Sequence, residues 1–397
     1  MQTSSERPEK PLRILMVSSA LPPAVDGIGD HAALMAKSLA GMGHSVTCLV
    51  PSGTTYADVP GVAIKPCWNP KVSTSVVDDI VDAVKQGTDV VYIHYNPFCY
   101  GKWGRNLALM NIRKRILAIN PDVKLAVMIH ERHVPLWPWR FTIMSLWQLP
   151  MYSSTLKQAD QVFVSTGPWM HEIESRVRSG VDVTCIPIGS SAGTPVISRT
   201  EARAQRHLPD DVTVVGVFGM PHISKGVDGL AAVLSKTATD VGPLTLLAVG
   251  GIGKAIPNDI PGVTVVRTDI LDARGVSDAF MCMDAFLCPF SDGISTRRSS
   301  MTVALAHGIP VVSNRGPSTV SLFEDDARYA AAFTLAESVT DDALTTALTK
   351  QLTDKHHWDR RSHAALALYR DVFSYEVTGA LVADKLAHLV AAESTKS

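Results

Sequence analysis

The sequence PFSDGISTRRSS (residues 289–300), followed by MTVALAH (301–307) and GIPVV (308–312), contains a complete strand–loop–helix–turn–strand pattern. An apolar run ends in this segment, a polar loop carries the adjacent Arg297 and Arg298, and a Gly-x-Pro turn leads into the next apolar run. A helix N-terminus beside arginine side chains attracts phosphates and other oxyanions. The segment therefore predicts an α/β unit with an anion-binding loop after one strand. Plain surface charge is the alternative explanation for the two arginines.

The same loop supplies further candidate ligand-binding residues. Ser299 or Ser300 is predicted to cap the next helix, because a serine hydroxyl accepts a hydrogen bond from the N–H groups of the first turn. The other polar or glycine positions predicted to contact a ligand are Asp292, Gly293 and Ser295.

Short apolar runs alternate with helical patterns along the rest of the chain. This alternation is typical of parallel sheets that helices cover on both faces, so the predicted fold class is α/β with Rossmann-like sheets. Helices are expected at 106–119 and 167–177, among other places. The runs expected to form strands are 12–18, 45–50, 90–94, 125–129, 162–165, 183–186, 212–218, 244–249, 263–266, 285–289 and 310–313.

The alternation breaks at residues 189–211, which are rich in Ser, Thr, Gly, Pro and charged residues. We therefore predict a first domain at 1–188, a linker at 189–211, a second domain at 212–372 and a final helical segment at 373–397. Open α/β sheets bind ligands at the carboxyl ends of their strands. Two such domains are expected to face each other across an interdomain cleft that holds the ligand.

Composition excludes several classes of protein. The 397 residues include 37 Lys and Arg against 38 Asp and Glu, a balance that argues against a general nucleic-acid binder. With 46% hydrophobic residues and a mean hydropathy of +0.12, the chain is not an acidic disordered protein. Six scattered cysteines without a Cys-x-x-Cys pair favour reduced thiols over structural zinc or disulfides. With no membrane-length apolar run and no signal peptide, we expect a cytoplasmic protein.

Two glycine-rich segments resemble nucleotide-binding motifs only in part. GIGDHA (27–32) fits G-x-G-x-x-A, but it begins well after the preceding strand, and residues 45–52 lack the acidic ribose ligand of an NAD site. Its glycines either let the backbone approach an anion or sugar closely, or serve only the loop's geometry. GGIGKA (250–255) lacks the first glycine and the Ser/Thr of a P-loop, which excludes an ATPase. The interpretation that remains for GGIGKA is a glycine turn that lies beside a bound nucleotide.

The segment FGMPHISKGVDG (218–229) follows the first strand of the second domain and opens a helix. Lys225 in this loop is predicted to stand over the cleft, where a leaving diphosphate requires positive charge. An ordinary surface lysine is the alternative.

Taken in order, these pieces resemble the GT-B glycosyltransferases of the large retaining family 4, which includes sucrose, trehalose and bacterial polysaccharide synthases. The resemblance implies transfer of a sugar from a nucleotide-diphosphate donor to an acceptor hydroxyl, with retention and without a metal or other cofactor. It also implies that the first domain binds the acceptor and the second the donor. The matching pieces are the 12–29 strand and loop, GHSV (43–46), VYIHYNP (91–97), IHE (129–131), IPIG (186–189), FG (218–219) with KG (225–226), VGG (249–251) and DGIS (292–295) with GIPVV (308–312).

The resemblance assigns roles to individual residues. It places His130 against the donor sugar near the reacting carbon, Lys225 on the diphosphate, and the last helix back on the first domain. With Arg297 and Arg298, these two residues form the predicted catalytic set. The remaining predicted substrate-binding residues are Gly27, Ile28, Gly29, His94, Asn96, Gly219, Gly250 and Gly251, together with Asp292, Gly293, Ser295, Ser299 and Ser300.

Three positions depart from the family pattern. Met220 stands where the family has an arginine, and Ser295 and Val303 stand where it has two glutamates. Arg297 and Arg298 are expected to supply the missing charge, and Asp292 is expected to take over a carboxylate role. The alternative is a catalytically inactive GT-B scaffold that binds a sugar nucleotide or a partner enzyme. A GT-B epimerase finds no support in the carboxylate pattern.

Three of the seven tryptophans, Trp137, Trp139 and Trp147, lie in one apolar stretch after His130. They would line an acceptor groove or touch a lipid-linked substrate at the inner membrane surface; interior packing or a subunit interface is the alternative. The sequence identifies neither the acceptor (a sugar, a glycolipid or a small molecule) nor the oligomeric state.

Overall fold

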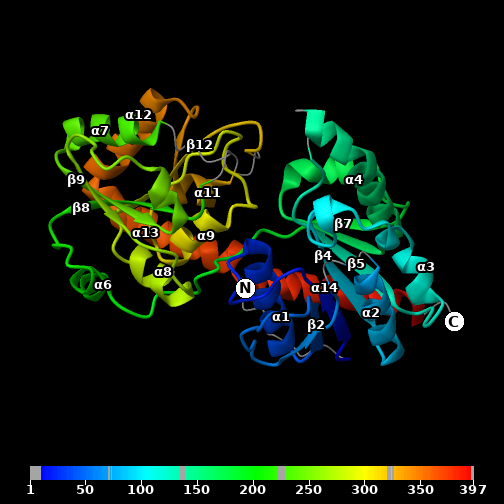
Figure 1. Cartoon of the computed structure of the whole chain (residues 1–397). Helices are drawn as coiled ribbons and strands as arrows, with labels where there is room; N and C mark the ends of the chain where they lie inside the picture. The colour runs from blue at the N-terminus through cyan, green and yellow to red at the C-terminus, as the bar shows by residue number, and fades with distance from the viewer. Residues whose placement is uncertain are drawn as a thin grey trace. The chain divides into compact units, whose positions relative to one another are not determined.

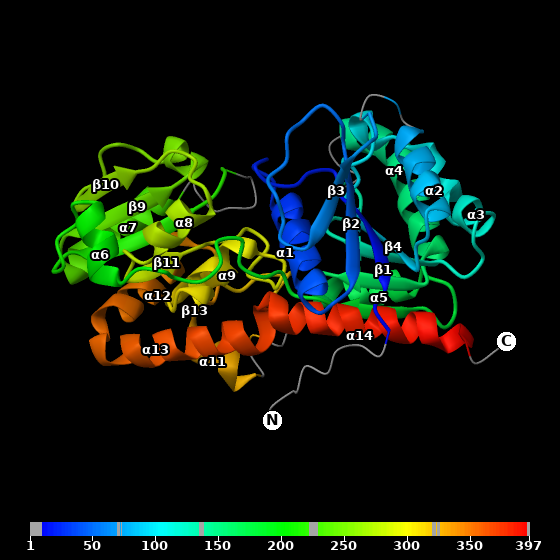
Figure 2. The same cartoon turned by 90° about the horizontal axis from the view of Figure 1, so that it is seen from below.

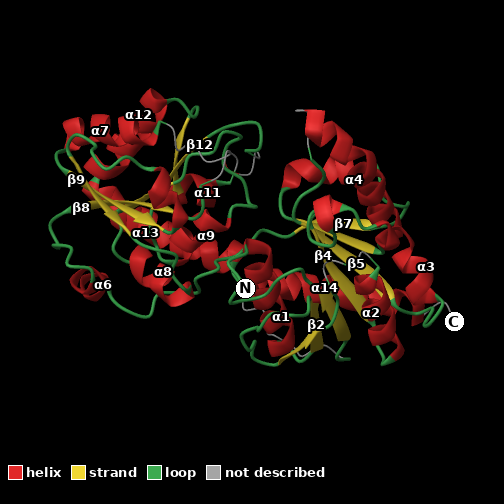
Figure 3. Ribbon diagram, viewed as in Figure 1, coloured by secondary structure: helices red, strands yellow, loops and turns green. Residues whose placement is uncertain are grey.

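A computed structural model describes residues 10–69, 72, 74–134, 139–221, 229–319, 323 and 326–394. The chain forms two compact units, one made of Met1–Pro187 with Tyr375–Ser397 and the other of Ile188–Ser374. Each unit contains one parallel sheet with helices on both faces (Figure 1, Figure 3). The predicted α/β class with two parallel sheets is confirmed.

The first unit contains a seven-stranded parallel sheet in the order β3-β2-β1-β4-β5-β6-β7. Its central strands β4 and β5 are buried at every residue, because helices cover both faces. The strands are β1 (Arg13–Val17), β2 (Ser45–Val50), β3 (Val62–Pro66), β4 (Val90–Tyr95), β5 (Lys124–Ile129), β6 (Gln161–Val164) and β7 (Asp182–Cys185).

Apolar side chains of α2, α3 and α4 form the core on one face of this sheet. On the other face α1 lies against β2, and α14 lies against β5 and β6. The helices of the unit are α1 (Gly27–Gly41), α2 (Ser75–Lys85), α3 (Ile112–Leu117), α4 (Trp139–Gln158), α5 (Met170–Glu174) and α14 (Tyr375–Ser394), with short turns η1 (Lys102–Gly104), η2 (Leu107–Asn111) and η3 (Gly167–Trp169).

The C-terminal helix α14 packs on α1 within the first unit, as Figure 2 shows. Ser38 Oγ donates a hydrogen bond to the carbonyl oxygen of Tyr375 at 2.6 Å, which fixes the start of α14 on α1. Farther along, Lys385 pairs with Asp182 at 3.0 Å. Tyr375 thus lies against α1, and its hydroxyl reaches His31 in the candidate site described below.

The second unit contains a six-stranded parallel sheet in the order β10-β9-β8-β11-β12-β13. Side chains of α8, α9 and α13 pack on one face, and those of α7 and α12 on the other. The strands are β8 (Thr213–Phe218), β9 (Leu244–Val249), β10 (Val263–Arg267), β11 (Ala285–Leu287), β12 (Val311–Asn314) and β13 (Phe333–Ala336). The helices and turns are α6 (Arg199–Gln205), α7 (Leu230–Val241), η4 (Gly251–Ala255), α8 (Ala273–Phe280), α9 (Ser299–Ala306), α11 (Ala327–Ala332), α12 (Asp341–Thr353), α13 (Lys355–Leu368) and the π-helical turn η5 (Tyr369–Phe373).

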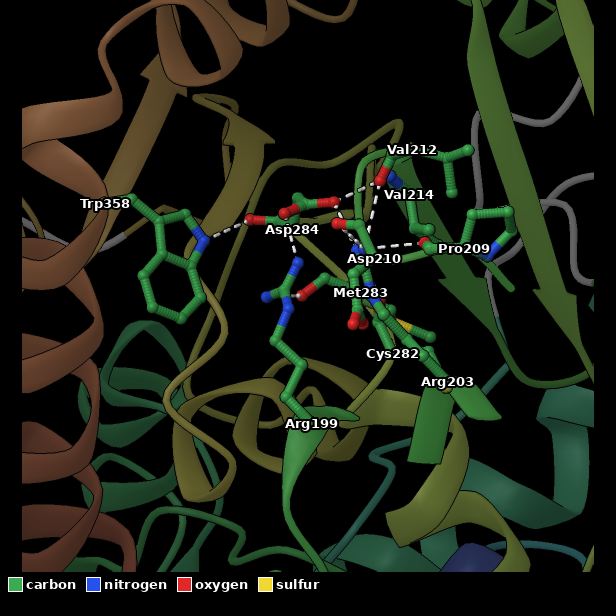
Figure 4. A network of polar contacts seen from close by, with 10 residues as sticks. All are labelled: Arg199, Arg203, Pro209, Asp210, Val212, Val214, Cys282, Met283, Asp284 and Trp358. Carbon is green, nitrogen blue, oxygen red and sulfur yellow. Dashed lines mark hydrogen bonds and ion pairs between the residues drawn. The ribbon is translucent and has the colours of Figure 1, made fainter. Parts of the chain in front are cut away.

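Residues 189–211, for which we predicted a linker, include α6 and are held in the second unit by a polar network around Asp284 (Figure 4). The Asp284 carboxylate accepts hydrogen bonds from Arg199, from Arg203 at 2.8 Å and from the N–H of Val214 at 2.7 Å. Arg203 is 1% exposed, and its guanidinium also donates to several carbonyl oxygens, so its buried charge is fully compensated. Trp358 donates to the Asp284 carbonyl oxygen at 2.8 Å.

Some predicted elements differ from the structure. The two helices expected at 106–119 and 167–177 each begin as a 3-10 turn, η2 and η3, and only then become α-helical. Strands β3 and β13 were not predicted: β3 is a half-exposed edge strand that ends in Lys65-Pro66, and β13 has only four residues. All six cysteines are free thiols, as their spacing predicted.

Candidate functional site

In the second unit, the loop between β11 and α9 is organised around Asp292. Its carboxylate accepts hydrogen bonds from Arg297 at 3.0 Å, from Arg298, and from the hydroxyl of Ser318 at 3.0 Å. Burial raises the pKa of Asp292, but Arg298 and Arg297 more than offset this and hold the pKa below its ordinary value. Asp292 is therefore a shared partner of two cationic side chains.

Both arginines are largely buried, with side chains 19% (Arg297) and 12% (Arg298) exposed. The guanidinium of Arg298 lies 4.2 Å from the centre of the Phe290 ring, a cation–π contact. These contacts fix the direction of the guanidinium, so the loop is preorganised to receive an anion.

Helix α9 begins at Ser299, directly after this loop, and its first turn has no side-chain cap. The prediction that Ser299 or Ser300 caps α9 is wrong: the N-cap residue is Arg298, whose side chain is engaged with Asp292 instead. The positive end of the helix therefore adds to the arginine charge rather than being satisfied by a serine.

Three predicted glycines lie where β8 and β9 end. The N–H of Gly219 donates to the Val249 carbonyl at 3.0 Å, and Gly250 (φ +83°) turns the chain into η4. A Cβ on Gly251 would lie 2.6 Å from Sδ of Met220, so these strand ends pack closely. Beside them is an apolar pocket with Phe218, Ile252, Leu287, Phe290 and Ser300 in its lining. Ser300 belongs to the first turn of α9, so the pocket adjoins the uncapped helix end.

Lys225 lies outside the described residues, in the segment 222–228. Its role on a diphosphate stays a prediction from the sequence. Gly293 is described and takes a left-handed conformation (φ +84°) against the backbone of Gly316, which only a glycine accommodates.

In the first unit, the strand register brings His94 and His130 together. His94 pairs with Met128 across β4 and β5, so His130 follows two residues on and faces the same side of the sheet as His94. Nδ1 of His94 lies 2.9 Å from Nε2 of His130, and the two rings stack. His31 of α1 completes the group, with Nδ1 3.1 Å from the hydroxyl of Tyr375. We call His31, His94 and His130 the histidine cluster.

The histidine cluster is neutral near pH 7. Burial lowers the pKa of His31 to about 4, and it holds the pKa values of His94 and His130 well below the ordinary value, with the neighbouring imidazoles adding to the effect. His94 is fully buried, whereas His130 is partly exposed. A ligand can therefore contact His130, and His94 can act only by orienting the His130 ring. A neutral imidazole suits a sugar hydroxyl better than a phosphate.

The cluster is also the one group in the described part of the chain whose His, Cys, Asp or Glu side chains lie close enough to share a metal ion, with ligand atoms within 4.8 Å of one another. In the direct contact, Nδ1 of His94 and Nε2 of His130 face each other at hydrogen-bonding distance. This arrangement fits a hydrogen bond between the two rings.

The start of α1, whose glycines are predicted to approach an anion or a sugar, has an acidic N-cap. Asp26 is the N-cap residue, and its carboxylate accepts the N–H of Gly29 at 2.7 Å, so that N–H is not free for a phosphate. Gly29 is packed on the backbone of Ala20, and Gly27 and Ile28 begin the helix. Burial, and then the charge of Asp26, raise the pKa of Asp30 to about 6. The acidic side chains favour sugar hydroxyls over a diphosphate at this turn.

Asn96 has a structural contact rather than an open side chain. Its Oδ1 accepts the N–H of Phe98 at 2.9 Å, which closes the turn after β4.

Two of the three positions that depart from the family pattern, Ser295 and Val303, are completely buried. The Ser295 hydroxyl has no hydrogen-bond partner among the described residues.

Several solved structures share this architecture. Sucrose-phosphate synthase from Thermosynechococcus elongatus matches with a TM-score of 0.69 and 16% identity, over 96% of this chain and 99% of that one. The catalytic domain of starch synthase IV from Arabidopsis thaliana, bound to ADP and acarbose, matches with a TM-score of 0.70 and 11% identity, over 96% and 100%. The chain has the GT-B fold. Anabaena HepE in complex with UDP also shares the GT-B fold (TM-score 0.65, 14% identity, 95% and 100%). No family model and no curated protein sequence matches the chain.

Proposed function

We propose that the protein transfers a sugar from a nucleotide-diphosphate donor to an acceptor hydroxyl, with retention of configuration and without a metal ion. The observation that carries the proposal is the convergence of Arg297 and Arg298 beside the uncapped start of α9, next to an apolar pocket at the strand ends. An anion-binding loop beside an apolar pocket suits a nucleoside diphosphate. The similar structures of starch synthase IV, bound to ADP, and HepE, in complex with UDP, support a nucleotide donor.

In this proposal the second unit binds the nucleotide diphosphate, and His130 of the first unit contacts the sugar. The bond from the anomeric carbon to the diphosphate oxygen breaks, the acceptor oxygen bonds to that carbon, and the hydroxyl proton is released. The principal barrier is the negative charge that develops on the leaving diphosphate. Lys225, Arg297 and Arg298 stabilise this charge, and preorganised donors of this kind contribute on the order of 3–4 kcal/mol each.

A second candidate is a non-catalytic GT-B protein that binds a sugar nucleotide or a partner enzyme. The burial of Ser295 and Val303 favours it, because neither position presents a carboxylate to a donor sugar or ribose. The carboxylate nearest to Ser295 in the sequence is that of Asp292, and it is already paired with Arg297 and Arg298.

Titration with UDP-, GDP- and ADP-sugars, followed by melting temperature, separates the two candidates. A donor at a hundredfold excess over its Kd stabilises the folded protein by about 2.7 kcal/mol, a shift that is easily measured. The transferase proposal expects one donor to stabilise the protein and an acceptor to trigger release of the nucleoside diphosphate. Stabilisation without release with any acceptor tested supports the second candidate. If none of the sugar nucleotides stabilises the protein, the transferase proposal is wrong, and the second candidate keeps only its form as a protein that binds a partner enzyme.

A further inference from the structure

The first half of helix α4 buries polar side chains and exposes apolar ones, whereas the second half packs Met151, Tyr152 and Leu156 into the core. Ser145 and Gln148 are 4% and 0% exposed, whereas Trp139, Ile143 and Leu146 are 69%, 47% and 72% exposed. The exposed three follow each other at the i, i+4 and i+7 positions, so they form one stripe on the helix surface. A surface helix in water has the opposite arrangement, with its apolar stripe toward the core. This stripe is therefore suited to a surface less polar than water.

A neighbouring loop extends the stripe. Phe98, Trp103 and Leu107 are 52%, 67% and 45% exposed, and the turns η1 and η2 in this segment pack on α4. The carbonyl oxygen of Trp103 accepts hydrogen bonds from Trp147 at 3.0 Å and from Gln148 at 3.4 Å. The polar side of α4 thus holds a loop that presents further apolar side chains. We call the exposed set the apolar platform: Phe98, Trp103, Leu107, Trp139, Ile143 and Leu146.

Trp103 keeps its exposed position in an unfavourable backbone conformation. Its φ is +56°, in the left-handed region that bulky residues rarely adopt. Strain of this kind persists only where surrounding contacts hold it, and it concentrates at functional positions. The two hydrogen bonds to the Trp103 carbonyl oxygen are contacts of that kind, so the exposed indole is held in place.

The two stretches of sequence that carry the platform contain no acidic residue. The sequence contains no Asp or Glu between Asp89 and Asp122, and none between Glu131 and Asp160. Lys102, Arg105 and Arg140 in these stretches are exposed, and within the described part of the chain they form no ion pair. The Lys102 ammonium lies 5.7 Å from the centre of the Trp103 ring. Aromatic rings, aliphatic side chains and unpaired cations therefore occupy the same part of the first unit.

We propose that the apolar platform binds the surface of a membrane that contains anionic lipids. Tryptophan and leucine side chains insert at the level of the headgroups, and Lys102, Arg105 and Arg140 attract the lipid phosphates. A bilayer surface imposes no fixed pattern of hydrogen bonds, which fits a platform of apolar and cationic side chains better than a protein partner does. None of the described helices is long and apolar enough to cross a bilayer, so the binding is peripheral. This inference is independent of the proposed sugar transfer.

Flotation of the full-length protein with vesicles tests the proposal. Vesicles of phosphatidylcholine mixed with phosphatidylglycerol are expected to bind the protein, and pure phosphatidylcholine to bind it weakly. The double variant Trp139→Ser/Leu146→Gln is expected to lose about tenfold or more in vesicle affinity, because it removes two exposed apolar side chains that would become buried in the bilayer surface. Arg140→Ala is expected to lose about fivefold, an effect that high salt reproduces in the native protein.

Matched controls come from the second unit. Ile270→Gln removes an exposed apolar side chain, and Arg274→Ala removes an exposed arginine. Both variants are expected to bind vesicles as the native protein does. Melting temperatures verify that every variant folds. Failure of the native protein to float with anionic vesicles overturns the proposal, as does undiminished binding by the double variant. Concentration-dependent self-association that the double variant abolishes also overturns it, because the platform would then be an interface between two copies of the chain.

Discussion

The loop at Asp292 and the histidine cluster both lie at the carboxyl ends of parallel strands, yet their electrostatics are opposite. Around Asp292, two arginines share one carboxylate and hold its pKa below the ordinary value. In the histidine cluster, burial removes the charge from three imidazoles. The two groups therefore occupy equivalent positions at strand ends, while burial and neighbouring side chains determine their charge. Our proposal assigns the charged loop to the diphosphate and the neutral cluster to the sugar hydroxyls.

The largest expected effect is on the charged side of this comparison. Arg298→Ala is expected to lower turnover about a hundredfold or more, because loss of one preorganised donor costs about 3–4 kcal/mol. The melting temperature should also fall, because Asp292 loses one of its two ion-pair partners. Turnover under saturating donor and acceptor measures the first effect, and calorimetry the second.

Arg274→Ala is the matched control, since Arg274 is an arginine of the same unit whose partner, Asp278, lies on its own helix. It should leave turnover unchanged. Native turnover in Arg298→Ala would remove this arginine from the proposed diphosphate site.

The histidine cluster, which is neutral near pH 7, is expected to make the folded protein less stable in acid. Burial lowers the pKa of His31 in the folded protein to about 4, below its ordinary value of 6.5. Between these pH values the unfolded chain binds more protons than the folded one, so stability is present above pH 6.5 and falls as the pH drops toward 4. A shift of this size corresponds to about 3 kcal/mol. Melting temperature measured from pH 7 to pH 4.5 should therefore decline less steeply in His31→Asn than in the native protein. The exposed His388→Asn should decline as the native protein does, and equal slopes for His31→Asn and the native protein would refute the assignment.

Sequence periodicity predicted the strands of both sheets well where they are continuous apolar runs. It missed β3, because Lys65 and Pro66 interrupt the apolar pattern of an edge strand that needs burial on one side only. It assigned Ser299 or Ser300 as a helix cap from local preference alone. In the structure the N-cap is Arg298, and a contact with Asp292 six residues earlier in the chain determines where its side chain goes.

The candidate site shows the same limit. The Arg297–Arg298 pair and His130 could be predicted from motifs at strand ends. His31, Ser318 and Tyr375 could not be, because each enters its group through packing between elements that are distant in the sequence. A usable signal existed for one pairing: His94 lies near the end of β4, His130 follows the adjacent strand β5, and the register of these strands puts both on the same side of the sheet. The Asp26 cap on Gly29 was also detectable, as an acidic residue just before a helix.

Within the histidine cluster, substitutions of His130 and of His94 should have different effects on kcat. His130→Ala is expected to lower kcat for transfer about tenfold, with the affinity for the nucleoside diphosphate unchanged, because this partly exposed imidazole contacts the sugar. His94→Phe keeps the ring but removes the hydrogen bond to His130, so a smaller loss of kcat is expected from a positioning residue. Calorimetric titration with nucleoside diphosphate and transfer assays separate the two parameters. A weakened nucleoside-diphosphate affinity in either variant would assign the cluster to the diphosphate instead of the sugar.

The smallest expected effect comes from Asp30, one residue before His31 on α1. Burial, and then Asp26, raise the pKa of Asp30 in the folded protein to about 6, above its ordinary value of 3.8. The folded state therefore binds the extra proton between these values, and the stability that Asp30 contributes in acid is lost as the pH rises through 6. Because the side chain is partly exposed, solvent screening keeps the effect below about 1 kcal/mol. Asp30→Asn should raise the melting temperature slightly at pH 8 but not at pH 4, and the exposed Asp58→Asn should change it at neither. Adjacent residues on one helix would then titrate with opposite effects on stability, because burial penalises the charged form of each: the carboxylate of Asp30 and the imidazolium of His31.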